Sequence, residues 1–136
     1  MNPRENLLSV AEQSLATLGY TSCGPEELPA MAVRENFPLA VLDEPELAHG
    51  VVATERVVTY DVEVKMLMYR ESPTDKSAPY LAIVEQDALA LASMVAECEP
   101  VRSVEVRELD VCVGGLTHVG DVSMAMRLRV EMFRNE

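Results

Sequence analysis

The sequence predicts an α+β fold, in which two main helices pack on one face of a mixed or mainly antiparallel sheet with long strands. Two long segments alternate between apolar and polar residues, as strands with one buried face do. Two other segments repeat apolar residues every three to four positions, as amphipathic helices do. A chain of 136 residues has the size of one domain, and we expect that domain to span 1–136.

The clearest alternation lies in 121–134. All of its even positions from Val122 to Met132 are apolar, whereas its odd positions include Arg127 and Arg129. A strand of roughly 13 residues spans about 43 Å at about 3.3 Å per residue, which is long for a small domain. We therefore expect other long strands beside it and a cover over its Met-rich face.

The segment Val51–Arg70 is the second long extended stretch, and its alternation is clear from Tyr60 onward. Upstream, its β-branched residues predict extended chain with a bulge near Thr54 and Glu55. Leu67 adds apolar area to the second face, so we expect the far end of this strand to be covered on both sides.

The third strand is expected over Val101–Val113. Its apolar residues change parity after Val106, so a bulge or bend is needed near Arg107 and Glu108. Residues 114–120 contain three glycines and predict a flexible hairpin loop that leads into the last strand.

A first helix is expected from about 3 to 18, with Asn2 as its N-cap and Gly19 as its left-handed C-cap. A second helix is expected over 79–97, with Ser77 as its cap. Its expected buried stripe consists of Tyr80, Ile83, Val84, Ala88, Leu91 and Val95.

The region between the first helix and the first long strand has weaker patterns. Residues 20–36 are rich in turn formers, and Glu26–Leu28 could form a short turn of helix. The apolar run Phe37–Leu42 suits a buried strand, and residues 43–50 form an acidic loop.

The composition excludes several classes of protein. A net charge of −12 opposes binding to nucleic acid or to an anionic membrane, because both need clustered Lys and Arg. The chain has no apolar run of about 18 residues and no signal-peptide core, so we expect a protein made and kept in a cytoplasm. Three cysteines without a CxxC motif fit a reducing compartment.

Several residues are candidates for chemistry. Cys112 and His118 could form a thiol–imidazole nucleophile, but no orienting third group is identifiable. Cys98, Cys112, His118 and Asp121 match no familiar zinc spacing. Asp43, Glu44 and Glu46 lack the pattern of a calcium loop, and His49 reads as a loop residue. We therefore expect no catalytic residue, no metal and no cofactor.

The length of the strands favours assembly instead, because long strands leave edges that can pair with another chain. Apolar side chains lie at or near predicted strand ends, and a row of arginines is expected to pair across strands first and to contact a neighbour second. The candidate interface residues are Leu67, Tyr69, Arg127, Arg129 and Phe133.

The order of these elements resembles that of the tail terminator, or tail completion, proteins of long-tailed phages. The similar segments are LATLGY, FPLAVLDEPE, VVTYDVEVKMLMYRE, PYLAIVEQDALALASMVAE and VSMAMRLRVEMF. The resemblance implies a virion or prophage structural protein, present in the host cytoplasm during assembly. It implies a hexameric ring that stops growth of the tail tube and meets the head connector.

Two other functions stay open. The chain could be a small dimeric binding or regulatory module whose Met-rich sheet holds an apolar ligand. It could also be a small enzyme that uses Cys112 or the acidic loop.

Overall fold

The computed structural model describes residues 2–72 and 74–134, over which it contains a six-stranded sheet. The strands are β1 (Thr21–Cys23), β2 (Leu39–Leu42), β3 (Glu46–Leu47), β4 (Val57–Tyr69), β5 (Val101–Val111) and β6 (Asp121–Phe133). The α-helices are α1 (Pro3–Thr17), α2 (Leu28–Met31) and α3 (Ala78–Ala96), and the 3-10 turns Pro25–Glu27 and Arg34–Asn36 flank α2.

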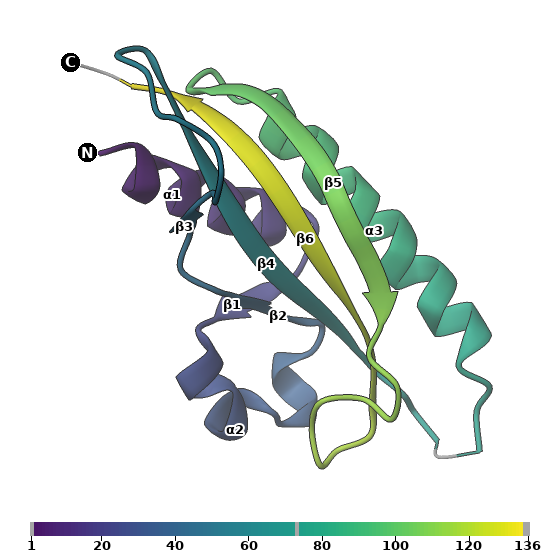
Figure 1. Cartoon of the computed structure of the whole chain (residues 1–136). Coiled ribbons are helices and arrows are strands. Elements are labelled where there is room, and N and C mark those ends of the chain that lie inside the picture. Colours follow the sequence, from purple (N-terminus) through teal and green to yellow (C-terminus); the bar gives the residue numbers. More distant parts are fainter. Residues whose placement is uncertain (1, 73, 135–136) are drawn as a thin grey trace.

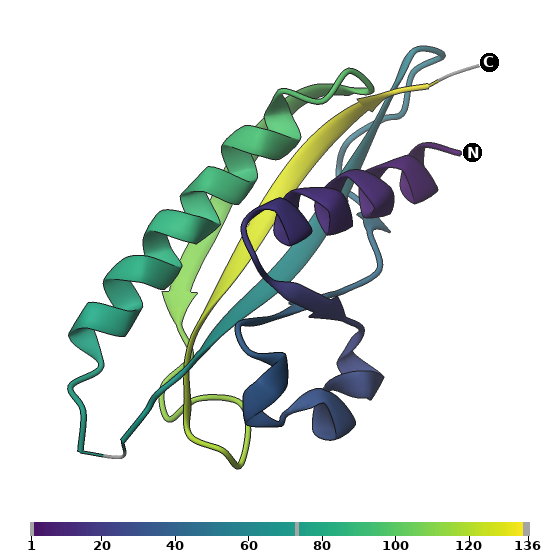
Figure 2. The ribbon, with the colours of Figure 1, turned by 180° about the vertical axis from the view of Figure 1, so that it is seen from behind.

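The strand order is β1-β2-β4-β6-β5, and β3 pairs with β4 beside this row. Only β1 and β2 run parallel, so the sheet is mixed and mainly antiparallel. Helices α1 and α3 lie on one face of the sheet and leave most of the other face open (Figures 1 and 2). The predicted α+β fold with long strands and two main helices on one face is confirmed.

Strands β4 and β6 form the centre of the sheet. They pair along their whole length of 13 residues each, from Val57 opposite Phe133 to Tyr69 opposite Asp121. Every even residue of β6 from Val122 to Met132 is buried, as the alternation predicts. From Met124 to Met132 these side chains belong to the core beneath α1 and α3, so the Met-rich face is packed protein interior.

Strand β5 forms one edge of the sheet and contains the predicted bulge. Its pairing with β6 shifts register between Val106 and Glu108, which leaves Arg107 as the extra residue. A second shift leaves Arg102 unpaired near the start of the strand. Because of the shift at Arg107, Val104 and Leu109 both pack against the core although their parities differ.

Helix α1 begins and ends as predicted. The Asn2 side chain accepts a hydrogen bond from the Glu5 backbone N–H at 2.8 Å, and Gly19 follows the helix with φ of +90°. Helix α3 begins and ends one residue before the predicted range, and the Ser77 side chain makes no capping hydrogen bond. The prediction that Ile83 is buried was wrong: it is 48% exposed, because it points away from the sheet side of α3.

The N-terminal half differs most from the prediction. Residues 51–56 are exposed and precede β4 instead of extending it, and a turn in which Thr54 N–H donates to the Val57 carbonyl replaces the expected bulge. The short strand β1 was not predicted. Beside it, a second apolar cluster lies on the open face, where residues of α2 and its flanks cover Leu39, Val41 and Leu67.

The loop 114–120 was expected to be flexible, but the carboxylate of Asp121 ties it down. That carboxylate accepts hydrogen bonds from the backbone N–H groups of Leu116 and Thr117, at 3.0 and 2.7 Å, and from the Thr117 hydroxyl at 2.6 Å. Three donor groups bonded to one buried carboxylate fix the turn that leads into β6.

Candidate functional site

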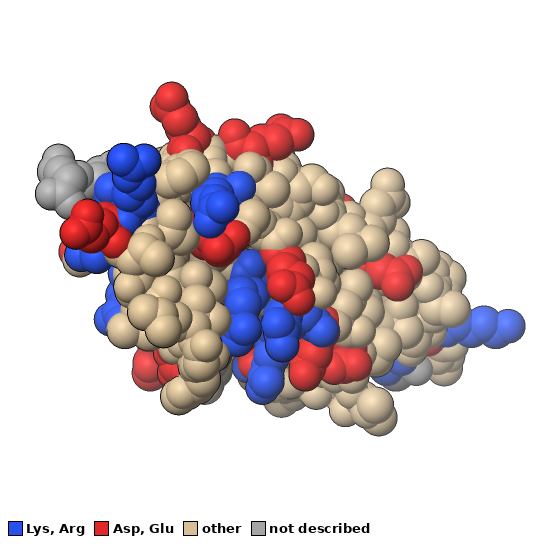
Figure 3. Space-filling view, turned by 45° about the horizontal axis from the view of Figure 1, so that its top comes forward, with Lys and Arg blue, Asp and Glu red and all other residues tan. Residues whose placement is uncertain are grey.

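A hollow lies on the open face of the sheet. It has a volume of about 470 Å³ and crosses β4, β6 and β5. Its acidic and basic lining residues are Asp43, Glu44, Glu46, Asp61, Glu63, Arg107, Glu108, Arg127 and Arg129, and His49 also lines it. We call this hollow the charged groove; Figure 3 shows basic and acidic side chains side by side on this face.

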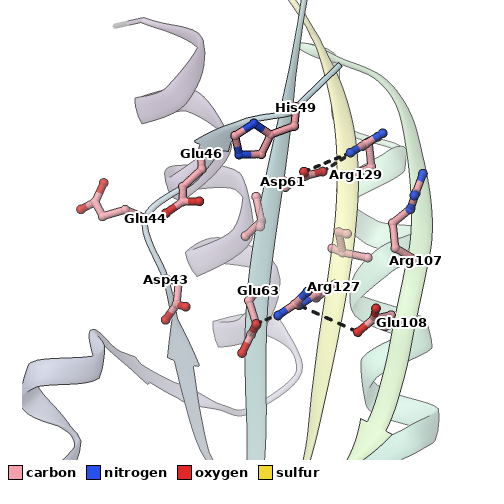
Figure 4. Close-up of a pocket in the computed structure, with 12 residues that line it drawn as sticks. Asp43, Glu44, Glu46, His49, Asp61, Glu63, Arg107, Glu108, Arg127 and Arg129 are labelled. Carbon is pink, nitrogen blue, oxygen red and sulfur yellow. Dashed lines mark hydrogen bonds and ion pairs between the residues drawn. The ribbon is translucent and has the colours of Figure 1, made fainter. Parts of the chain in front are cut away.

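The floor of the charged groove consists of ion pairs across strands. Arg129 on β6 lies opposite Asp61 on β4 and donates to both of its oxygens, at 2.9 and 3.1 Å. Arg127 lies opposite Glu63 and donates to it at 3.1 Å (Figure 4). The alternation that buries the even residues of β6 places these arginines on the open face.

These contacts shift the pKa values of the acids. The hydrogen bond from Arg129 lowers the pKa of Asp61. The hydrogen bond from Lys65, at 2.9 Å from Glu63, lowers the pKa of that carboxyl, and Arg127 adds to the effect. Both acids therefore stay ionised near neutral pH. Ionised carboxylates suit fixed ion pairs, whereas a general acid must carry a proton that it can give away.

The acidic loop that was considered for a cation forms one wall of the groove. Burial raises the pKa of Asp43, and its Oδ1 has no hydrogen-bond partner among the described residues. Glu44 and Glu46 are exposed (Figure 4). Over the described part of the chain, no group of three His, Cys, Asp or Glu residues is placed to hold a metal ion.

The candidate nucleophile is not assembled. Cys112 is half-buried beside a second hollow of about 260 Å³, which His118 does not line. Burial raises the pKa of the Cys112 thiol, which disfavours the reactive thiolate. Asp121, the nearby carboxylate, is already engaged by its loop.

The five candidate interface residues have different environments. Leu67 is completely buried beneath the α2 region, so it does not lie on the surface of the subunit as the interface prediction required. Tyr69 is half-buried, with the Phe37 ring 5.8 Å and the Arg34 guanidinium 5.4 Å from its ring. The remaining three are accessible: the Arg127 and Arg129 side chains are 61% and 23% exposed, and Phe133 is 42% exposed.

The acids that line the charged groove outnumber its arginines, so the groove carries net negative charge and is a poor surface for a polyanion. Sequence reasoning identified the arginine row but not its partners Asp61 and Glu63. Their matching alternation on β4 could have indicated them once the pairing of β4 with β6 was known.

Comparison with known proteins gives no relative: neither the family models nor the curated proteins compared with this chain match its sequence. Within residues 2–72 and 74–134, no helix combines the length and the apolar character that crossing a membrane requires.

Proposed function

We propose that this chain is a structural assembly subunit of the phage tail terminator type. In this proposal, copies form a ring that caps the tail tube and joins it to the head connector. The observation that carries the proposal is the size and exposure of the sheet: strands of 13, 13 and 11 residues have helices on one face, and most of the other face is open. A wide, stiff sheet with a free face suits repeated contact between subunits.

The charged groove is the surface proposed for contact between neighbours in the ring. Arg127 uses its Nε for Glu63 at 3.1 Å and for Glu108 at 3.9 Å, while its side chain stays 61% exposed. Its other guanidinium N–H groups can therefore donate to a carboxylate of a neighbouring copy while Nε keeps its own partners. Exposed Phe133 at the end of β6 adds apolar area to such a contact.

The net charge supports the same function. A ring of subunits that each carry −12 would line a channel with negative charge, and DNA passing through such a channel would be repelled from its wall. The arginines of the groove are already paired with acids, so they do not offer a free basic track for a phosphate backbone.

The test uses the purified chain together with tail tubes assembled from a tube protein encoded in the same genome, which the proposal requires to exist. Negative-stain electron microscopy should show rings at the ends of the tubes, and tubes should stop growing when the chain is added. Arg127→Glu should abolish this capping. Arg34→Glu makes the same change in charge at an exposed ion pair outside the groove and should leave capping intact. Tubes that grow unchanged in the presence of the wild-type chain contradict the proposal.

A further inference from the structure

The outer edge of β5 is unpaired. Strand order places β5 at the end of the sheet, so within residues 2–72 and 74–134 no strand pairs with it on the side away from β6. The strand is 11 residues long, and neither a proline nor a lysine interrupts it. Such an edge offers free backbone N–H and C=O groups to another strand.

The hydrogen bonds to β6 show which backbone groups are free after the bulge. Cys112 N–H donates to the Ser123 carbonyl at 2.9 Å. The backbone groups of Cys112, Asp110 and Glu108 therefore point toward β6. The backbone groups of Leu109 and Val111 therefore point away from the sheet.

The same reasoning applies before the bulge. Phe133 N–H donates to the Pro100 carbonyl at 2.9 Å, which marks the odd residues of β6 as those that bond β5. Ser103 and Glu105 lie opposite odd residues of β6. The backbone groups of Val104 and Val106 therefore point outward.

These four outward residues form a self-complementary set. When two copies of β5 are placed antiparallel about a two-fold axis between Arg107 and Glu108, Val104 lies opposite Val111 and Val106 lies opposite Leu109. Each outward residue then meets another outward residue. We infer that β5 is a pairing edge for β5 of a second copy of this chain, which joins the two sheets into one.

The bulge makes this pairing selective. An extra residue at Arg107 shifts the outward positions from even to odd numbers, so a regular strand cannot match both halves of β5. A second copy carries the same extra residue at the same distance from the axis. The bulge at Arg107 therefore disfavours pairing with a regular strand but allows pairing with β5 of a second copy.

The charges across the axis oppose and support the pairing at different positions. Arg107 would lie opposite Glu108 of the second copy, which is favourable. Glu105 would lie opposite Asp110, which is unfavourable because both are acidic. Arg107, with its Nη1 3.3 Å from Glu105, lies close enough to reduce this repulsion.

Apolar side chains at the edge would be covered by the contact. Val106 and Val111 are 39% and 47% exposed although they project toward the helix side of the sheet. Helix α3 packs over β5 (Figure 2). Pairing of two β5 strands would therefore bring the two α3 helices side by side. The exposed side of α3 that contains Ala82, Leu89 and Ala96 offers small and apolar residues to this approach, and Glu85 on the same side adds one negative charge.

This contact goes beyond the proposed ring, because a two-fold pairing closes on itself whereas a ring needs two different surfaces on each subunit. The two inferences fail separately. A ring that tolerates disruption of β5 leaves the proposed function intact, and a dimer that never caps tubes leaves the β5 pairing intact.

The first test is Val106→Pro, measured by analytical ultracentrifugation over a range of concentrations. Val106 N–H points away from β6, so proline removes a donor to the second copy without removing one from the internal ladder. Wild type should form a dimer of twice 15.0 kDa, and the variant should weaken dimerisation at least about tenfold. Val113→Pro, at a 94% exposed position after the strand, is the control and should dimerise like wild type. Circular dichroism confirms that each variant is folded.

The second test is Asp110→Lys, which replaces the like-charged contact with Glu105 by an opposite-charged one at two symmetric places. It should tighten the dimer by about tenfold at low salt. Glu12→Lys, at an exposed position of α1, changes the net charge equally and should tighten the dimer less. A wild-type chain that stays at 15.0 kDa at every concentration overturns the inference, as does an oligomer that Val106→Pro and Asp110→Lys leave unchanged.

Discussion

Arg129 and Asp61 face each other directly across β6 and β4 and form a two-pronged ion pair, with nitrogen–oxygen distances of 2.9 and 3.1 Å. The pair fixes the middle of the open face. It also ties the stability of the sheet to pH, because the hydrogen bond from Arg129 lowers the pKa of Asp61 in the folded chain.

Asp61→Asn should therefore lower the free energy of unfolding near neutral pH and have little effect in acid. A carboxyl whose folded pKa is depressed contributes stability above its unfolded pKa of about 3.9 and loses it as the pH falls through the folded pKa. Urea unfolding of both proteins from roughly pH 6 to roughly pH 3 measures the difference. A difference that grows as the pH falls would contradict the assignment.

Met126→Asp should prevent folding, whereas Arg127→Asp should still give a folded chain. Met126 is completely buried between the sheet and its helices, so aspartate there would be an unpaired charge in the core. Arg127 is the next residue on the same strand, but its side chain is 61% exposed on the open face. Soluble yield and circular dichroism separate the two variants. An equal loss of soluble, folded protein in both would contradict the assignment of Met126 to the core and Arg127 to the open face.

Gly115→Ala should destabilise the chain more than Gly114→Ala. Both glycines have left-handed φ values, +77° and +81°, so alanine costs about 1–2 kcal/mol at either position. Only at Gly115 would the added Cβ also come within 2.5 Å of the Asp121 backbone oxygen. The comparison by urea midpoint isolates this close approach, and equal midpoints would show that the loop moves aside.

Tyr20→Phe should cost about 1–3 kcal/mol of unfolding free energy. The hydroxyl of buried Tyr20 donates to Asp87 on α3 at 2.7 Å and so joins the segment after α1 to α3. Burial and the neighbouring carboxylate raise the pKa of Tyr20 well above its ordinary value. A double-mutant cycle with Asp87→Ala should give a coupling energy of about 1–2 kcal/mol. No coupling would mean that the hydroxyl contributes through packing alone.

Much of the sheet could be predicted from sequence because its central strands have one buried face. The even residues of β6 and the matching residues of β4 have no arrangement other than a strand that buries them together. The bulge in β5 was also predictable, since Val104 and Leu109 cannot both pack against the core without an extra residue between them.

The parts that could not be predicted depend on tertiary contacts. Strand β1 is only three residues long and gains its place from parallel pairing with β2, which leaves little local pattern. Ile83 fits the apolar spacing of α3, but the sheet covers only part of that stripe. The apolar second face at Leu67 correctly predicted a cover at this end of β4, but the sequence did not show that the α2 region of the same chain supplies it, so Leu67 was wrongly expected at an interface.

The charged groove was predictable only in part for the same reason. Alternation places Arg127 and Arg129 on the polar face, but which acids meet them depends on the register between β4 and β6. The partner strands are separated by more than 50 residues of chain, and many registers would bury the same apolar faces.

The position of β6 between β4 and β5 also has a consequence for biosynthesis. A ribosome makes β4 and β5 before β6, so these two strands are synthesised before the strand that pairs with both of them. The growing polypeptide therefore exposes its apolar sheet residues until the final strand leaves the exit tunnel, and chaperones that shield nascent chains would be expected to bind during that interval.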